Sequence, residues 1–360
     1  MINLLEIEQN WIKQFDKPLI LAGPCSAESE EQVLKIAEDL DKSYVQVYRA
    51  GIWKPRTKPG NFEGVGAIGL GWLKKVKEKY NILTSTEVAN AEHCKLALEA
   101  GIDILWIGAR TTVNPFQVQE IAEALKNTDK IVLVKNPVNP DLELWVGALE
   151  RLAAMGIKKL GVIHRGFSTY KKTKYRNKPQ WQIALEFKKQ YPNIPIICDP
   201  SHITGNRDAI LEVSQQAFNF EYNGLMIETH NDPDNAWSDA KQQVTPARLL
   251  EILKELEIRK HDSDGSLYQA TISQLRSEID ELDQQLLEAV SHRMKVVNQI
   301  GGLKKEHNVA VFQPGRWEEI SNRLKAEGLK LNLSEELVEK ILEVIHQESV
   351  GIQNDVMNKK

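Results

Sequence analysis

Oxygen and imidazole donors follow two short apolar segments in the middle of the chain. Ile194–Cys198 and Gly224–Ile227 are bounded by turn residues and have the length of buried strands. A single such donor is more typical of a helix-capping Asp or a surface His. Donors bunched after strand ends instead point to a divalent metal site. The residues at or just beyond these two ends are Asp199, His202, Glu228, His230 and Asp239.

Cations follow several other apolar segments in the first two thirds of the chain. Each alone is more often a surface charge with its stem laid along apolar surface. If the segments are strands of one sheet, however, these cations converge and repel one another unless polyanions lie among them. The forked guanidinium of Arg suits phosphate and carboxylate, so we expect substrates rich in both groups. The cations are Arg49, Arg110, Lys135 and Arg165 at segment ends, with Lys54 and Arg56 in the loop after Arg49.

The elements that carry these residues alternate regularly. Eight apolar segments, from Leu19–Ala22 onward, are separated by patterns typical of helices, and the third of them, Asn81–Ser85, ends near Glu87. Such alternation over about 250 residues predicts an α/β fold, a (β/α)₈ barrel whose active site lies at the C-terminal ends of its strands. All of the candidate metal-binding residues and cations would then lie together at the C-terminal end of the barrel.

The C-terminal part of the chain has a different pattern. Arg259–Ser266 is charged, contains Gly and Ser, and is predicted to be a linker between a barrel of residues 1–258 and a helical domain of residues 267–360. Beyond the linker, apolar residues recur at threes and fours and predict one helix from about Ser266 to Glu306, roughly 60 Å long. A helix of that length must pack against partners, so a coiled-coil or bundle dimerisation module is the default interpretation.

Composition excludes several classes of protein. With 46 basic and 50 acidic residues and a net charge of −4, nothing indicates binding to nucleic acid or to an acidic membrane surface. The chain has no apolar run near the ~20 residues of a membrane span, and its acidic, amphipathic N-terminus does not resemble a signal peptide. Three widely spaced cysteines suit a reducing compartment. We therefore expect a cytoplasmic protein.

Several motifs together resemble the type I 3-deoxy-D-arabino-heptulosonate 7-phosphate (DAHP) synthases. They are AGPCSAES, RAGIWKPRT, IGAR, VKNP, IHRGF, DPSH and IETHNDPDNAWSD, and the likeness runs from about Leu19 to Arg248. That family condenses phosphoenolpyruvate with erythrose 4-phosphate at the head of the shikimate pathway. The resemblance implies a metal held by Cys25, His202, Glu228 and Asp239. This donor set would accept Mn²⁺, Fe²⁺, Co²⁺ or Zn²⁺.

The resemblance also implies substrate contacts. Lys54, Arg56 and Thr57 of KPRT would contact the aldose phosphate. The sister synthase that makes 3-deoxy-D-manno-octulosonate 8-phosphate from arabinose 5-phosphate has a KAN-type motif there, so KPRT favours the four-carbon aldehyde. Lys54 is the candidate proton donor to the new alkoxide, with a pKa that we expect neighbouring cations to lower, although a purely electrostatic role is the alternative. The phosphoenolpyruvate residues would be Arg49, Arg110, Lys135 and Arg165, with Glu87 nearby.

The segment LRSEIDELDQQLLEAVSHRMKVVNQIGGLKK resembles the first helix of the all-helical chorismate mutases, and the likeness covers about Ser266 to Asp355. In that family the mutase is an intertwined dimer, which implies that Arg276 reaches into the partner's site. The chain departs from the family at Trp317, where Glu is frequent, and at Gln313, where Asp is common. The implied chorismate contacts are Arg276, Arg293, Lys304 and Arg316, with Ser349 and Gln353 in the last helix.

Three functions are consistent with these patterns. The first is a bifunctional DAHP synthase and chorismate mutase, whose mutase domain mediates feedback by prephenate or chorismate. The second keeps the synthase but makes the helical domain a sensor or dimerisation module without turnover. The third makes the barrel an octulosonate 8-phosphate synthase with a dimerising tail. The KPRT motif and the mutase-like cations favour the first.

Overall fold

The computed structural model describes residues 4–55, 60, 62–170, 173–259 and 266–358. The chain divides into two compact units, Met1–His261 and Asp262–Lys360. The predicted linker, Arg259–Ser266, falls almost wholly outside the described residues.

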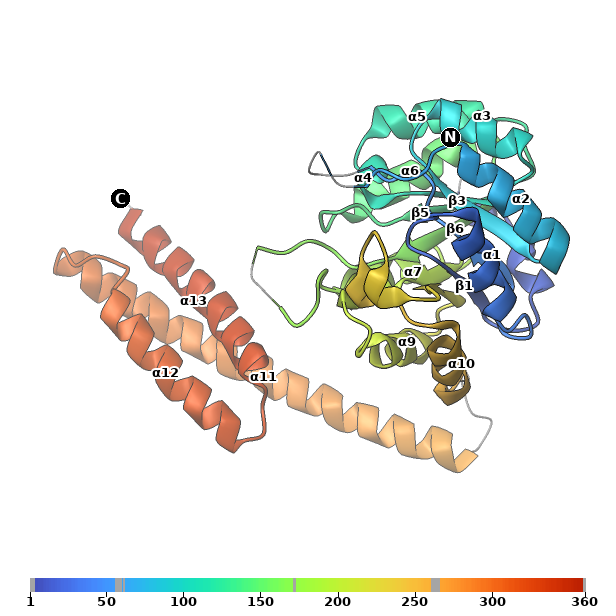
Figure 1. The fold of residues 1–360 in the computed structure, drawn as a ribbon. Coiled ribbons are helices and arrows are strands. Elements are labelled where there is room, and N and C mark those ends of the chain that lie inside the picture. The colour runs from blue at the N-terminus through green and yellow to red at the C-terminus, as the bar shows by residue number, and fades with distance from the viewer. Residues whose placement is uncertain (1–3, 56–59, 61, 171–172, 260–265, 359–360) are drawn as a thin grey trace. The chain divides into compact units, whose positions relative to one another are not determined.

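The N-terminal unit is a barrel of eight parallel strands with helices around it (Figure 1). Strand order follows chain order, and β1 pairs with β8 to close the barrel. The predicted (β/α)₈ barrel is confirmed. Its strands are β1 (Leu19–Gly23), β2 (Val47–Arg49), β3 (Leu83–Val88), β4 (Ile104–Ile107), β5 (Ile131–Lys135), β6 (Lys159–His164), β7 (Ile196–Cys198) and β8 (Gly224–Glu228).

The barrel helices begin at polar caps that the sequence supplies. Ser29, Asn90 and Asp141, for example, each accept a hydrogen bond from a backbone N–H in the first turn of the helix that follows. The α-helices are α1 (Glu30–Asp39), α2 (Ile68–Tyr80), α3 (Ala91–Glu99), α4 (Ala109–Thr112), α5 (Pro115–Ala124), α6 (Leu142–Ala154), α7 (Trp181–Gln190), α8 (Pro200–Thr204), α9 (Ile210–Asn219) and α10 (Pro246–Glu255). Short 3₁₀ helices are η1 (Leu4–Glu6), η2 (Asn10–Gln14), η3 (Pro233–Asn235) and η4 (Ala240–Gln242).

Two strands begin later than expected. Asn81 adopts a left-handed conformation with φ 48° and ends α2, so β3 begins at Leu83 and runs through Glu87. The side chain of Glu87 therefore belongs to the strand and not to the loop after it. Likewise, β7 begins at Ile196 and not at Ile194.

Apolar side chains fill the inside of the barrel. Leu19, Leu21, Trp106 and Met226 are among those packed together there. Trp11 of η2 joins this interior cluster, and its Nε1 donates a hydrogen bond to the carbonyl of Leu160, near the start of β6, at 3.0 Å. The N-terminal segment therefore closes the end of the barrel at which the strands begin.

The C-terminal unit is helical. It comprises α11 (Ser266–Glu306), α12 (Pro314–Lys330) and α13 (Glu335–Asn358), and α13 packs against both of the others. The single long helix predicted for Ser266–Glu306 is confirmed. None of the helices in the described residues is both long and apolar enough to cross a membrane.

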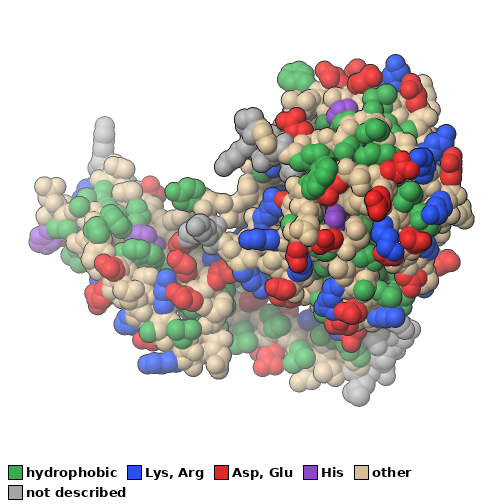
Figure 2. Space-filling model, viewed as in Figure 1, with side chains coloured by type: hydrophobic (Ala, Val, Ile, Leu, Met, Phe, Trp, Pro, Cys, Tyr) green, Lys and Arg blue, Asp and Glu red, His purple; other side chains and the backbone are tan. Residues whose placement is uncertain are grey.

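The first half of α11 carries apolar side chains that no described residue of its own unit covers. Between residues 268 and 289 only Ile272 is even half-buried. Hydrophobic side chains lie exposed along the C-terminal helices (Figure 2). In α11 the large ones are Tyr268, Leu275, Ile279, Leu282, Leu286, Leu287, Val296, Ile300 and Leu303. A helix with this surface is stable in water only when a partner covers it.

The closure of the barrel generates a stability prediction. Gly224 lies opposite Leu19 where β8 meets β1, and a Cβ added there would lie 2.0 Å from the Leu19 carbonyl oxygen. We expect Gly224→Ala to destabilise the barrel by roughly 1–3 kcal/mol or more, as overpacked cores are. Thermal unfolding followed by circular dichroism measures the effect.

Gly147→Ala is the matched control. Gly147 lies inside α6, and a Cβ added there meets no atom within 4 Å. Because Ala is about 1 kcal/mol more favourable than Gly inside a helix, this variant should be as stable as the wild type or more so. Equal melting temperatures for Gly224→Ala and the wild type would contradict the close approach of β8 to β1.

Candidate active site at the carboxyl end of the barrel

Three of the predicted metal ligands come together at the ends of β1 and β8. Cys25 lies just after β1, Glu228 is the last residue of β8, and Asp239 lies in the loop beyond it. Their ligand atoms all lie within 4.8 Å of one another, and Cys25 Sγ is 3.3 Å from Asp239 Oδ2. Asp239 is held in a left-handed conformation with φ 47°, which is uncommon for a residue other than Gly. These three donors are close enough together to hold one metal ion.

His202 lies beside this group but outside it. Its Nε2 is 3.8 Å from Glu228 Oε1, and its Nδ1 is 2.8 Å from Asp199 Oδ2. Asp199 follows β7 and caps α8, and its Oδ1 also accepts a hydrogen bond from the backbone N–H of His202 in the first turn of that helix. A metal-binding His usually has a carboxylate at its other ring nitrogen, so the Asp199–His202 pair fits a fourth ligand.

The charges in this cluster suit a cation. Burial raises the pKa of the Glu228 carboxyl, but His202, Arg49 and Lys54 outweigh burial and lower it to about 2. Burial also raises the pKa of Asp239, but the charges of Arg176 and His202 lower it below its usual range. Burial and the charge of Glu228 raise the pKa of the Cys25 thiol to about 12. The carboxylates are thus ionised, and a metal bound by the thiolate would release a proton.

Two of the predicted phosphoenolpyruvate residues form buried ion pairs. Arg49, at the end of β2, lies 3.0 Å from Glu228 Oε1, and Lys135, at the end of β5, lies 2.8 Å from Asp199 Oδ2. Both cations also lie over the ring of Trp106, at 4.9 and 5.8 Å from its centroid. The expectation that the cations repel one another unless polyanions lie among them is therefore wrong for two of them, because Glu228 and Asp199 pair with Arg49 and Lys135.

The remaining residues of this predicted group lie in different surroundings. The guanidinium of Arg165, just after β6, donates to Asn177 Oδ1 at 2.8 Å, and burial lowers its pKa to about 10. Glu87 accepts a hydrogen bond from Trp106 Nε1 at 3.1 Å. Arg110 belongs to α4, after β4, and is exposed.

Lys54 lies beside Cys25, one of the predicted metal ligands. Its Nζ donates to Cys25 Sγ at 2.7 Å and to the Cys25 carbonyl at 2.9 Å. The predicted lowering of its pKa is wrong. Burial does lower the pKa of Lys54, but the charges of Cys25 and Glu228 outweigh burial and raise it. The other two residues of the KPRT motif, Arg56 and Thr57, lie outside the described residues.

Four residues of this site had no role in the sequence-based prediction. Arg49 and Lys135 lie over the ring of Trp106. Arg176 pairs with Asp239 Oδ1 at 2.8 Å. Gln242 and Gln243 are buried and hydrogen-bond to the donor segments. Trp106 had one signal, because it is an aromatic residue in an otherwise aliphatic strand. The other three had none, since Arg and Gln in loops are usually exposed.

The helical unit brings three predicted chorismate residues together. Arg293 of α11 donates to Ser349 Oγ of α13 at 2.7 Å. One turn further along α13, Gln353 Nε2 donates to the Ser349 carbonyl at 3.1 Å, while Gln353 Oε1 is buried and has no hydrogen-bond partner among the described residues. The other three predicted chorismate residues are cations, and their surroundings differ from those of Arg293. Lys304 donates to the Val311 carbonyl, Arg316 pairs with Glu319, and Arg276 is exposed in the first half of α11.

Trp317, where the mutase family often has Glu, stacks on His346. Their ring centroids lie 4.0 Å apart, and Phe312 lies 5.8 Å from the same His. His346 is three residues before Ser349 on α13, so both side chains lie on the same face of that helix. The rings of Trp317, Phe312 and His346 therefore lie beside the contact between Arg293 and Ser349.

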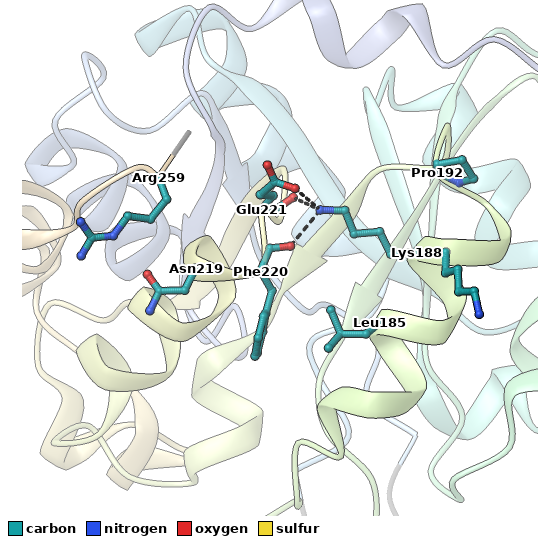
Figure 3. Close-up of a pocket in the computed structure, with 8 residues that line it drawn as sticks. Leu185, Lys188, Pro192, Asn219, Phe220, Glu221 and Arg259 are labelled. Atoms are coloured by element: carbon teal, nitrogen blue, oxygen red, sulfur yellow. Dashed lines mark hydrogen bonds and ion pairs between the residues drawn. The ribbon is translucent and has the colours of Figure 1, made fainter. Parts of the chain in front are cut away.

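A hollow of about 520 Å³ lies elsewhere on the barrel, between α7 and the segment that leads into β8 (Figure 3). Its central cation, Lys188, is already bound to the carbonyls of Phe220 and Glu221 and to the Glu221 carboxylate. It adjoins the starts of the strands, so it does not belong to the metal-donor cluster. Its lining comprises Leu185, Lys188, Lys189, Pro192, Asn219, Phe220, Glu221 and Arg259.

Comparison with known families agrees with this architecture. The model of the DAHP synthetase I family matches residues 5–261. The chain belongs to that family. The model of chorismate mutase type II matches residues 275–354, so a mutase domain follows the synthase. The protein therefore combines two enzyme domains of the shikimate pathway.

Individual relatives are similar to the synthase unit. Phospho-2-dehydro-3-deoxyheptonate aldolase of Thermotoga maritima is 32% identical over 238 residues, which are 66% of this chain and 68% of that protein. A crystal structure of that DAHP synthase superposes with a TM-score of 0.60 at 30% identity and covers 66% of this chain and 68% of its own. A 2-dehydro-3-deoxyphosphooctonate aldolase of Rickettsia typhi is 28% identical over 264 residues, 68% of this chain and 91% of that protein.

Proposed function

We propose that the barrel, residues 1–258, is a metal-dependent DAHP synthase that joins phosphoenolpyruvate to erythrose 4-phosphate. The observation that supports this most is that the cluster of Cys25, Glu228 and Asp239 adjoins the buried cations at one end of the barrel. A divalent ion held by these residues and His202, such as Mn²⁺, Fe²⁺, Co²⁺ or Zn²⁺, would supply Lewis-acid activation of the aldehyde oxygen.

The protein's own residues bind and orient the substrates. Arg49 and Lys135 are fixed over Trp106 and, with Arg165 and Arg110, supply the charge that the phosphate and carboxylate of phosphoenolpyruvate need. Carbon 3 of phosphoenolpyruvate can then attack the aldehyde, after which water adds at carbon 2 and phosphate leaves. The raised pKa of Lys54 keeps its Nζ protonated beside Cys25, so it can donate that proton to the new alkoxide.

We further propose that residues 267–360 convert chorismate to prephenate as a homodimer. Arg293, Ser349 and Gln353 form a preassembled polar group suited to a dicarboxylate, which supports turnover over a purely structural helical tail. Arg276 lies among the exposed apolar residues of the first half of α11. A second copy packed on that half would bring its own Arg276 to the site and cover the apolar surface.

The mutase domain also provides a route for feedback. It acts near the end of the pathway that the synthase begins, and the predicted tether of Arg259–Ser266 is short. Bound prephenate or chorismate can slow the synthase only if the liganded mutase interacts with the barrel differently from the free mutase.

The metal proposal predicts the effect of removing one ligand. Cys25→Ala should abolish synthase activity and reduce bound metal, measured by elemental analysis of the purified protein, because one donor of the set is lost. Cys94→Ala is the matched control, since Cys94 is also buried but lies in the hydrophobic core around α3. Mutase activity should be unchanged in both variants. Full synthase activity in EDTA-treated, metal-free protein would contradict the proposal.

The mutase proposal predicts the effect of removing its central cation. Arg293→Ala should lower chorismate turnover by roughly two orders of magnitude or more, because a substrate carboxylate loses its charged donor. Arg323→Ala removes an exposed Arg from α12, where it pairs only with Glu327, and should leave turnover unchanged. Chorismate consumption measures both variants. Unaltered turnover in Arg293→Ala would mean that the site lies elsewhere.

The feedback proposal predicts inhibition that depends on the helical domain. Prephenate should slow the synthase in the full chain, and Arg293→Ala should weaken this inhibition because it weakens binding to the mutase site. A chain stopped at Ile258 should escape inhibition if it retains synthase activity. A full-length synthase whose rate is untouched by saturating prephenate and chorismate would rule this coupling out.

A further inference from the structure

Two consecutive glutamines contact the segments that carry three of the metal donors. Gln242 is the last residue of η4 and Gln243 follows it, and their side chains are almost wholly buried, at 1% and 0% exposure. Glutamine is mostly exposed in proteins, so two adjacent buried ones need a reason. Their hydrogen bonds show what they hold.

Gln242 joins the two carboxylate donors. Its Nε2 donates to Glu228 Oε2 at 2.6 Å, and its Oε1 accepts from Arg176 at 2.7 Å. The same guanidinium nitrogen donates to Asp239 Oδ1 at 2.8 Å. This bridge requires one donor and one acceptor in the same uncharged group. A glutamine amide provides both, with N–H donors on its nitrogen and an acceptor on its oxygen. Gln242 therefore sets the positions of Glu228 and, through Arg176, of Asp239.

Gln243 joins the thiol segment to the Asp239 segment. Its Oε1 accepts from the backbone N–H of Cys25 at 2.9 Å, and its Nε2 donates to the Ser238 carbonyl at 2.8 Å. A hydrogen bond of 2.6 Å between the hydroxyls of Ser26 and Ser238 links the same two loops. The loop after β1 is thereby fixed, at Cys25 and Ser26, to Ser238, the residue before Asp239 in the loop after β8.

We propose that Gln242 and Gln243 are positioning residues that hold Cys25, Glu228 and Asp239 in place for a divalent ion. The donor atoms of these three residues lie within 4.8 Å of one another, where the two carboxylates repel. The amide of Gln242 holds Glu228 without adding a positive charge to those of Arg49 and Arg176, so it competes less with a cation for that carboxylate than a further Lys or Arg would. The inference rests on the metal site proposed above.

Metal affinity of the full chain tests this role. We expect Gln242→Met and Gln243→Met to weaken Co²⁺ binding to metal-depleted protein by about 10- to 100-fold, as loss of groups that hold metal ligands usually does. Gln243→Met should also weaken the thiolate-to-Co²⁺ absorption, because Cys25 loses its anchor. Excess Co²⁺ should restore much of the synthase rate, so the metal concentration for half-maximal activity rises more than the maximal rate falls.

Gln9→Met is the matched control. Gln9 is also buried, at 6% exposure, and its Oε1 accepts from the Leu160 backbone and from Trp11 Nε1 at the opposite end of the barrel. The Gln9→Met variant should be less stable than the wild type but should bind Co²⁺ with wild-type affinity. If the Met variants of Gln242 and Gln243 do not fold, the Asn variants keep an amide one methylene short of its partners and should show the same weakening.

Wild-type affinity and an unaltered thiolate absorption in both glutamine variants would overturn the inference. Equal weakening in Gln9→Met would overturn it as well, because the effect would then follow from stability alone. Failure of the metal site itself is distinguishable, since the wild type would then show no thiolate absorption with Co²⁺.

Discussion

Buried charges at the carboxyl end of the barrel must be paired, and this requirement shapes the site. An unpaired charge in a protein interior is strongly destabilising, so Arg49 and Lys135 are tolerable there only beside Glu228 and Asp199. These pairs connect β2 with β8 and β5 with the end of β7. They also fix both cations over Trp106 before any substrate arrives.

The same two carboxylates connect the cations that we propose bind phosphoenolpyruvate, Arg49 and Lys135, to the proposed metal ligands. Glu228 faces Arg49, accepts from Gln242 and lies in the donor cluster, while Asp199 faces Lys135 and His202. An ion bound by Glu228 would share that carboxylate with Arg49. Metal and phosphoenolpyruvate should therefore influence each other's binding, and the barrel's apolar interior, closed at its other end by Trp11, provides the rigid support for both.

The sequence is informative where a residue's role follows from its place along the chain. Alternation of apolar strands and helices predicts the barrel, and Glu228 and Lys135 lie at strand ends as expected. Apolar periodicity likewise predicts α11 over its full length. The role of Cys25 came from family resemblance, because a lone Cys after a strand is usually a small buried hydrophobe.

Properties that depend on several distant segments could not be predicted in this way. The predicted sign of the pKa shift of Lys54 was wrong because the neighbours that decide it are distant in sequence: Cys25 lies just after β1 and Glu228 at the end of β8. The contacts of Gln242 and Gln243, from which their positioning role is proposed, depend on the positions of three loops. In the helical unit, the contact of Arg293 with Ser349 depends on how α13 packs against α11.

We propose that the barrel is a metal-dependent synthase selective for a four-carbon aldose phosphate. The most direct test supplies phosphoenolpyruvate with either erythrose 4-phosphate or arabinose 5-phosphate, in metal-depleted and metal-restored protein, and measures phosphate release. We expect rapid phosphate release only with erythrose 4-phosphate and restored metal. Equal release without metal, or preferential use of arabinose 5-phosphate, would contradict it.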